Sequence, residues 1–265
     1  MAGEVGQLGE AGKAGELGDP GEAGQVLRLA VWSGPRNVST ALMRAWENRG
    51  DTLVVDEPLY AHYLDVTGID HPGRAEVVRA GETDWRAVVA ALLGPVPRGV
   101  GIYYQKHMAH HLLAGIDRSW VTQLTNVLLI RDPREVVASY VRSRRDVAVA
   151  DIGLTQQVEL YDQLMAAGTT PLVIDSADLL RDPEGYLRGW CDRLGVGFTD
   201  RMLSWPAGPR ASDGVWGEHW YAAVWRSTGF EPYRPRDIRL SPEAAAVADA
   251  CLPLYARLHA ARWSL

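Results

Sequence analysis

The sequence predicts an α/β protein in which a parallel central sheet is flanked by helices, in a P-loop-like arrangement. Short apolar runs alternate with amphipathic segments along most of the chain, and such alternation is typical of parallel strands joined by helices. Prolines and capping residues also stand where helices are expected to begin. In sheets of this kind, ligands bind beyond the carboxyl ends of the strands. A functional site is therefore expected where the strands end.

Each element is expected from its own stretch of sequence. The predicted strands are the apolar runs 27–32, 52–57, 100–107, 126–131 and 171–175. The predicted helices are a segment that follows residue 38 and continues to about 49, and then 84–93, 133–142, 154–167, 183–194 and 242–262. Asp132 and Asp182 each precede a proline, as an N-cap does before a first-turn proline. The segments at the carboxyl ends of the strands are 33–40, 56–60, 106–111 and 131–139.

The chain divides into a tail and one domain. Glycine occupies every third position from Gly3 to Gly24. This period is collagen-like, but Pro20 is the only proline there, whereas collagen needs many. We therefore expect residues 1–26 to form a disordered, glycine-rich tail. The remaining 27–265 are long and apolar enough for a single domain with a sizeable core.

Composition excludes several classes of protein. The formal net charge of −6 argues against broad nucleic-acid binding, which needs a concentrated positive surface. No apolar run approaches the roughly 18 residues that span a bilayer, and no leader-like segment opens the chain. Cys191 and Cys251 lie in apolar stretches and are expected to be buried thiols. We therefore expect a cytoplasmic protein without a membrane partner, with a homodimer left open.

The loop after the first predicted strand is a candidate anion site. Residues 33–40 read SGPRNVST and lead into a helix. A helix start offers unpaired backbone N–H groups and the positive end of the helix dipole, and Arg36, Ser39 and Thr40 add polar donors. The alternative is an ordinary capped turn with Asn37 as the N-cap. A Walker-type loop would need a second glycine and a lysine, and because both are missing here an ATP-using kinase is disfavoured.

A second anion site is predicted after the fourth strand. Arg131 ends that strand, and Ser139 follows eight residues later, two turns into the next helix. One guanidinium and one hydroxyl at this separation suit a phosphate monoester. The alternative is that Arg131 pairs with Asp132 or another nearby carboxylate. We expect the two anion pockets to be separate and about a nucleotide's length apart.

Together these segments resemble the sulfotransferases that use 3′-phosphoadenosine-5′-phosphosulfate (PAPS), with bacterial, soluble members as the subgroup indicated. Residues 33–40 are similar to the 5′-phosphosulfate loop of that family, residues 131–139 to its 3′-phosphate segment, and 175–195 to its following strand and helix. The resemblance implies a sulfotransferase-type fold, PAPS as co-substrate and no metal. It assigns the following residues to the donor: Gly34, Pro35, Arg36, Asn37, Val38, Ser39, Thr40, Arg131 and Ser139. Arg36 stands where the family usually has a lysine.

Two residues at strand ends are candidates for the catalytic base. Glu57 follows the second strand, where several members of the resembled family use a glutamate. Lys106 and His107 look like the Lys-x-His segment of animal cytosolic members, but without the intervening residue. Adjacent residues on a strand point to opposite faces, so these two cannot both address one atom while the strand continues. We favour Glu57 as the base over His107, and expect Lys106 to assist the leaving oxygen.

The sequence thus predicts transfer of a sulfuryl group from PAPS to a hydroxyl or amine of a small-molecule acceptor by in-line displacement. A non-catalytic nucleotide-binding domain and a kinase-like phosphotransferase are the alternatives. No carboxylate or cysteine lies at helical spacing from His107, His110 and His111, so a metal site is not expected. Aromatic residues near the predicted loops could line an acceptor pocket: Tyr60, Tyr63, Trp85, Tyr103, Trp216, Trp220 and Tyr221. Trp190, Trp225 and Tyr255 are expected to be core residues.

Overall fold

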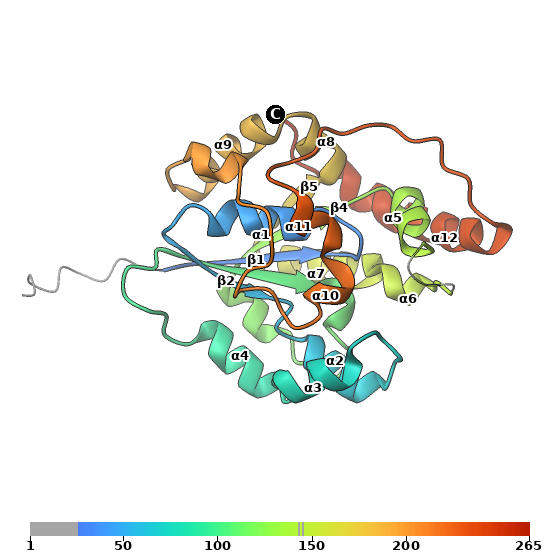
Figure 1. Ribbon diagram of the computed structural model, residues 1–265, viewed down its shortest axis with the longest axis horizontal. Coiled ribbons are helices and arrows are strands. Elements are labelled where there is room, and N and C mark those ends of the chain that lie inside the picture. Colours follow the sequence, from blue (N-terminus) through green and yellow to red (C-terminus); the bar gives the residue numbers. More distant parts are fainter. Residues whose placement is uncertain (1–25, 143, 145) are drawn as a thin grey trace, which may run out of the picture.

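The computed structural model describes residues 26–142, 144 and 146–265 (Figure 1). The predicted disordered tail, residues 1–26, lies outside the described residues except for Val26. No helix in the described part of the chain is both long enough and apolar enough to cross a membrane.

The core of the molecule is a five-stranded parallel sheet with the strand order β2-β3-β1-β4-β5. Its strands are β1 (Leu27–Ser33), β2 (Thr52–Asp56), β3 (Ile102–Met108), β4 (Thr125–Ile130) and β5 (Leu172–Asp175). Trp32 of β1 is level with His107 of β3 and Leu128 of β4. The central strands therefore end together at one edge. The predicted fold class is confirmed, and every predicted strand is present within two residues of its expected bounds.

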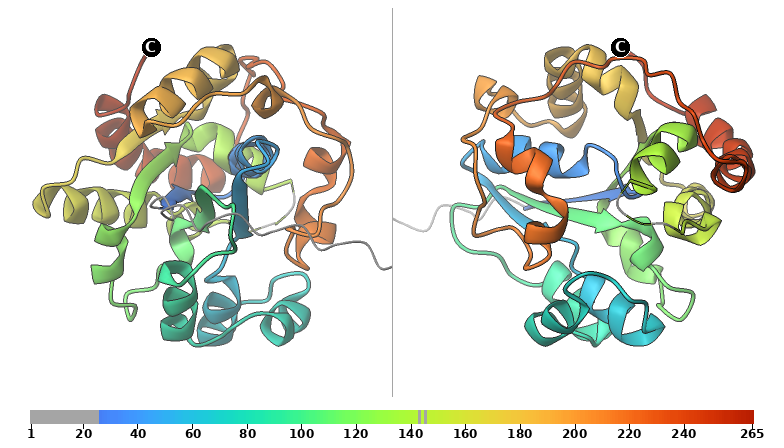
Figure 2. Two further views of the ribbon diagram at one scale, coloured as in Figure 1. Left: turned by 90° about the vertical axis from the view of Figure 1, so that its left-hand side faces the viewer. Right: turned by 45° about the vertical axis from the view of Figure 1, so that its right-hand side comes forward.

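Helices cover both faces of the sheet (Figures 1 and 2). On one face, Leu29 and Val31 pack against Trp46 and Trp190. The elements on this face are α1 (Ser39–Glu47), α8 (Ser176–Arg181), α9 (Pro183–Leu194) and η3 (Asp200–Leu203). Successive side chains of a strand point to opposite faces, so Ala30 and Trp32 belong to the core on the other side. That second core packs against α4 (Trp85–Leu93), η2 (Ser119–Gln123), α5 (Pro133–Tyr140), α6 (Val149–Ile152), α7 (Leu154–Ala166) and α12 (Pro242–Ala260).

The short helices α6, α8, α10 (Gly217–Trp220) and α11 (Ala222–Arg226) were not predicted, and neither were α2 (Tyr60–Thr67) and α3 (Arg74–Ala80), which follow β2. Helices α2 and α3 bury Tyr60, Leu64 and Val77 in a small core of their own. The 3-10 helix η1 (Ala109–His111) follows β3 and packs against α2. Both α2 and α3 are short, and α2 ends at Gly68, whose left-handed backbone (φ 64°) stops the helix.

The chain between α9 and α12 is largely irregular and includes α10 and α11. We call residues 204–229 the crossing segment, because an antiparallel bridge between Ser204 and Gly229 joins its two ends. In Figure 1 it runs in front of the sheet, near β2 and α1. The crossing segment brings Tyr221 to the carboxyl ends of β2 and β3.

The predicted helix caps are partly confirmed. The Asp132 side chain accepts a hydrogen bond from the backbone N–H of Arg134 (2.8 Å), and Asp182 accepts one from Gly185 (2.9 Å). Asn37, in contrast, is not the N-cap of α1, because that position belongs to Val38. The Asn37 amide instead donates to the backbone carbonyl of Leu129 in β4 (3.0 Å). It therefore fixes the β1–α1 loop against the neighbouring strand.

Candidate active site

A cavity of about 940 Å³ lies at the carboxyl ends of the strands. Its walls come from the β1–α1 loop, the ends of β2, β3 and β4, helix α5 and the chain between α10 and α12. All four segments expected at the carboxyl ends of the strands contribute to it. The predicted site residues that line it are Pro35, Arg36, Asn37, Val38, Ser39, Thr40, Glu57, Lys106, Arg131 and Ser139.

Gly34 is not among the lining residues, and the structure gives it another role. A Cβ at this position would lie 2.3 Å from the backbone oxygen of Ile152. Only glycine lets the β1–α1 loop approach the end of α6 this closely. Two residues further on, Arg36 adopts a left-handed backbone conformation (φ 56°), which is uncommon outside glycine. The loop is thus shaped by close packing on one side and a strained residue on the other.

The two predicted anion pockets meet in the structure. Arg36 Nε donates to Ser139 Oγ (3.0 Å), and Arg131 Nη1 donates to the backbone oxygen of Arg36 (2.9 Å). Our expectation that the pockets are separate is therefore wrong: the three residues lie together in one continuous cationic wall of the cavity. Arg131 also pairs with a nearby carboxylate, as the alternative foresaw, but the partner is Glu135 (2.9 and 2.7 Å) and not Asp132. Glu135 in turn accepts a hydrogen bond from Tyr233 (2.8 Å).

Positive charge dominates the cavity wall. Seven basic side chains line it against three carboxylates, Glu57, Glu135 and Glu231. The basic residues are Arg36, Lys106, Arg131, Arg142, Arg144, Arg234 and Arg236. Burial lowers the pKa of Arg36, and the like charges of Arg131 and Arg142 lower it further. Crowded like charges of this kind are relieved when an anion binds among them.

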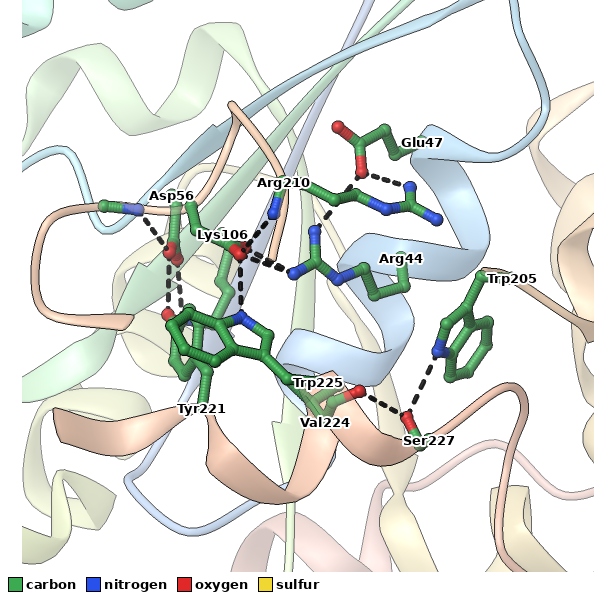
Figure 3. Close-up of polar contacts among 12 residues, drawn as sticks. Arg44, Glu47, Asp56, Lys106, Trp205, Arg210, Tyr221, Val224, Trp225 and Ser227 are labelled. Carbon is green, nitrogen blue, oxygen red and sulfur yellow. Dashed lines mark hydrogen bonds and ion pairs between the residues drawn. The ribbon is translucent and has the colours of Figure 1, made fainter. Parts of the chain in front are cut away.

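A second polar cluster surrounds Lys106 at the ends of β2 and β3 (Figure 3). Lys106 Nζ is buried and donates to Asp56 Oδ1 (2.7 Å), Glu57 Oε1 (2.6 Å) and the Tyr221 hydroxyl (2.8 Å). Burial alone favours the neutral amine, but Asp56 and Glu57 outweigh it and raise the pKa of Lys106. Lys106 is therefore a fixed ammonium whose three donors all have partners.

Glu57 is the member of this cluster best placed to take up a proton. Its side chain is 11% exposed and lines the cavity, whereas Asp56 is 1% exposed and lies behind it. Burial raises the pKa of Glu57 and the charge of Asp56 raises it further, against the opposing effect of Lys106. Glu57 also has a left-handed backbone (φ 42°). Such conformations concentrate at functional sites, where the surrounding structure enforces them.

His107 does not reach the cavity. It lies on β3 beside Lys106 and points to the opposite face, as expected for adjacent strand residues. Its ring stacks on Trp32 with the ring centroids 4.0 Å apart, and Nε2 lies 3.3 Å from Gln105 Oε1. Burial, followed by the charge of Lys106, lowers its pKa to about 3. His107 is a neutral core residue here, and this position argues against it as a base.

The neighbouring histidines line the cavity instead. His111 stacks face to face on Tyr60 at a centroid distance of 4.6 Å, and His71 Nδ1 lies 2.9 Å from the Tyr60 hydroxyl. His71, His110, His111, Tyr60, Tyr140 and Trp220 all contribute to this aromatic wall. Across the described residues, no three histidine, cysteine, aspartate or glutamate side chains are grouped so as to hold a metal ion.

Sequence reasoning missed two members of the site. Asp56 directly precedes Glu57, but only the structure shows it accepting from Lys106 and Tyr221 (2.7 Å each). Tyr221 was expected only to line a pocket, as it does, but its hydroxyl also belongs to the polar cluster around Lys106. The other aromatic expectations have mixed outcomes. Tyr60 and Trp220 line the cavity, Trp190 is core, and Trp85 and Tyr103 pack in the core on the far face of the sheet.

The structure is thus an α/β protein with a cationic cavity at the carboxyl edge of its parallel sheet, where ligands bind in folds of this class. Comparison with known proteins gives the family. The sulfotransferase domain family matches residues 27–262, and the chain belongs to this family. The predicted family is therefore confirmed.

Two curated relatives come from Arabidopsis thaliana. Branched-chain-amino-acid aminotransferase-like proteins 1 and 2 are 40% identical over 227 residues and 35% identical over 225 residues, respectively. Each match covers 84% of this chain but only 40% of the relative. The chain thus spans about two fifths of the length of these relatives, and their names describe much longer proteins.

Solved structures support the fold. The sulfotransferase domain of the olefin synthase from Synechococcus PCC 7002 has a TM-score of 0.51 at 18% identity, covering 88% of this chain and 97% of that one. A sulfotransferase from Alicyclobacillus acidocaldarius has a TM-score of 0.50 at 15% identity, covering 91% and 98%. The sulfotransferase-type fold is confirmed.

Proposed function

We propose that this protein transfers a sulfuryl group from PAPS to a hydroxyl or amine of a small-molecule acceptor by in-line displacement. The observation that carries the proposal is that one cavity joins a cationic wall to a buried carboxylate–lysine cluster. The first suits a multiply charged nucleotide donor, and the second suits proton removal from an acceptor. PAPS dependence and the two catalytic roles are our proposal, resting on this pairing and on the family.

The residues of the cationic wall fit the anionic ends of PAPS. Arg36, Ser39 and Thr40 would hold the 5′-phosphosulfate at the start of α1, where backbone N–H groups are unpaired. Arg131 and Ser139 would hold the 3′-phosphate. Within the described part of the chain, Arg131 donates three of its five N–H groups to Glu135 and to the backbone of Arg36, which leaves two for a phosphate. A bound phosphate would also replace Arg36 as the partner of Ser139.

Glu57 and Lys106 would carry the chemistry. When PAPS is bound, it supplies an activated sulfur. The acceptor oxygen or nitrogen forms a bond to that sulfur while the bond from sulfur to the 5′-phosphate oxygen breaks. Glu57 takes the proton from the acceptor, and Lys106 stabilises the negative charge that develops on the leaving oxygen. The products are a sulfated acceptor and 3′-phosphoadenosine 5′-phosphate.

Radiolabelled transfer and ligand-induced stabilisation test this function. With ³⁵S-labelled PAPS and a panel of phenols, alcohols, sugars and amines, we expect label in at least one acceptor. We also expect 3′-phosphoadenosine 5′-phosphate to raise the Tm far more than ATP, which lacks the 3′-phosphate. Equal stabilisation by ATP would favour the kinase-like alternative. Stabilisation by the bisphosphate without transfer to any acceptor would favour a non-catalytic nucleotide-binding domain.

A further inference from the structure

Tyr221 connects the crossing segment to the catalytic cluster (Figure 3). Its hydroxyl lies 2.8 Å from Lys106 Nζ, 2.7 Å from Asp56 Oδ2 and 3.1 Å from Trp216 Nε1. A phenol has one proton to donate and can accept two. Lysine and indole nitrogens only donate, so the hydroxyl accepts hydrogen bonds from Lys106 and Trp216. Its own O–H therefore donates a hydrogen bond to Asp56. Glu57 Oε1, at 3.3 Å, is a second and more distant acceptor of the same O–H.

The crossing segment fixes the position of this hydroxyl. Asp213, within the segment, pairs with the buried guanidinium of Arg44 in α1 (2.6 Å between Nη2 and Oδ1). The same carboxylate accepts from Trp225 Nε1 and from the backbone N–H of Arg210, both at 2.9 Å. Asp213 thereby fastens the segment to α1 on one side of Tyr221 and to α11 on the other. The polar cluster around Lys106 is therefore complete only when β2, β3 and the crossing segment have come together.

We propose that Tyr221 is a positioning residue for sulfuryl transfer: its hydroxyl holds Asp56 and Lys106 so that Glu57 meets the acceptor as a carboxylate. This inference rests on the function proposed above. It goes further by giving the C-terminal part of the chain a role in proton removal. The mechanism is electrostatic, because an Asp56 that has lost its hydrogen-bond donor repels a charge on Glu57 more strongly.

The groups around Glu57 determine the direction of the effect. It faces Asp56 from β2, Lys106 from β3, Tyr60 from α2 and Tyr221 from the crossing segment. Beyond these lies His111 of η1, whose pKa burial lowers well below its usual value, with a contribution from Lys106. Tyr221 lowers the pKa of Glu57 through its hydrogen bond, and Asp56 raises it. Loss of the hydroxyl therefore shifts the pKa of Glu57 upward through both groups.

The pH dependence of turnover in Tyr221→Phe tests the proposal. A general base must be deprotonated, so the acid limb of kcat/KM reports its ionisation. We expect the midpoint of that limb to move to higher pH by about half a unit to one unit. Tyr103→Phe is the matched control, since Tyr103 is a buried tyrosine of β3 in the core on the far face of the sheet. An unmoved midpoint with a lower plateau would overturn the proposal, because a merely structural tyrosine would give that result.

A second measurement does not depend on activity. The chain has two lysines, Lys13 and Lys106, so the signal of ¹³Cε-labelled lysine in a Lys13→Arg background comes from Lys106 alone. Its chemical shift should follow the ionisation of Glu57, with a higher midpoint in Tyr221→Phe. If the shift moves but the parent protein transfers no sulfuryl group, the proposed function fails while the coupling stands. If neither readout moves in folded protein, the role of Tyr221 is disproved. Should Tyr221→Phe not fold, Trp216→Phe must give a smaller shift in the same direction.

Discussion

At the scale of single residues, Glu57 combines features that rarely occur together by chance. A left-handed backbone costs a residue other than glycine about 1–2 kcal/mol, and a carboxylate loses hydration when it is buried. Its contact with Lys106 offsets part of that loss. The same arrangement leaves one carboxylate edge towards the cavity. A residue selected for stability alone would have neither the strain nor the location.

Replacing Glu57 with glutamine should separate catalysis from binding. Glutamine keeps the shape and an oxygen that can accept from Lys106, but it cannot take up a proton. We expect Glu57→Gln to lower kcat by about 10²–10⁴-fold, the usual contribution of a general base. The Kd for 3′-phosphoadenosine 5′-phosphate, measured by calorimetry, should stay within about threefold of the parent value, as expected when about 0.7 kcal/mol or less is lost. Full activity of this variant would rule out Glu57 as the base.

Replacing Arg131, in contrast, should weaken the binding of the nucleotide. Removal of its guanidinium takes away charge-assisted hydrogen bonds, worth about 1.5–3 kcal/mol each. We expect Arg131→Ala to raise the Kd for 3′-phosphoadenosine 5′-phosphate by about 10–100-fold. Arg134→Ala is the matched control, because Arg134 lies three residues further on, in the first turn of α5, but is exposed and pairs with Asp249. Equal Kd values for the two variants would remove Arg131 from the donor site.

At the scale of elements, the β1–α1 loop depends on a close backbone approach. The carbonyl of Ile152 occupies the place where a side chain on residue 34 would lie. We expect Gly34→Ala to displace the loop and to weaken the binding of 3′-phosphoadenosine 5′-phosphate by about tenfold, or 1.4 kcal/mol. Gly115→Ala is the control, since a Cβ there would meet nothing within 4 Å. An unchanged Kd in Gly34→Ala would show that the loop tolerates the shift.

Elements also show what the sequence can predict. The five strands and six larger helices follow from local periodicity, and Asp132 and Asp182 cap helices as their proline-flanked positions suggest. The missed helices, among them α2 and α3, have eight residues or fewer and carry little periodic signal. Helix α5 is as short as α2, but Asp132 and Pro133 mark its start. The aspartate next to Glu57 gave no sign of its partner, because Tyr221 is 165 residues away. Contacts across such distances are decided by how the crossing segment packs and not by local pattern.

At the scale of the whole molecule, charge is unevenly distributed. The chain carries a formal net charge of −6, yet basic side chains outnumber carboxylates in the cavity wall. The net charge of the whole chain therefore does not reveal the charge of its cavity. A positive cavity in a negative molecule directs anions to one place, and salt should weaken that attraction.

Buried histidines should make the stability of the whole molecule sensitive to acid. Burial lowers the pKa of His71 to about 4 and those of His107 and His110 to about 3. In the unfolded chain these groups bind protons below about pH 6.5. Between pH 7 and 5 the unfolded state therefore binds more protons, and the free energy of unfolding falls as the pH falls. For one histidine with a folded pKa near 3, the loss over this interval is about 2 kcal/mol. Urea unfolding at several pH values measures it.

His107 allows this argument to be tested together with its exclusion from the chemistry. His107→Phe keeps an aromatic ring to stack on Trp32 but has no proton to gain, so the fall in unfolding free energy between pH 7 and 5 should be smaller by about 2 kcal/mol. His219→Gln is the control, because it also removes one histidine, at an exposed position. The pKa of Glu57 is raised, so this residue makes the free energy of unfolding rise as the pH falls. Its contribution is the same in both variants. Sulfuryl transfer by His107→Phe should persist at pH 7.5. A folded but inactive variant would mean that the imidazole, and not Glu57, is the base.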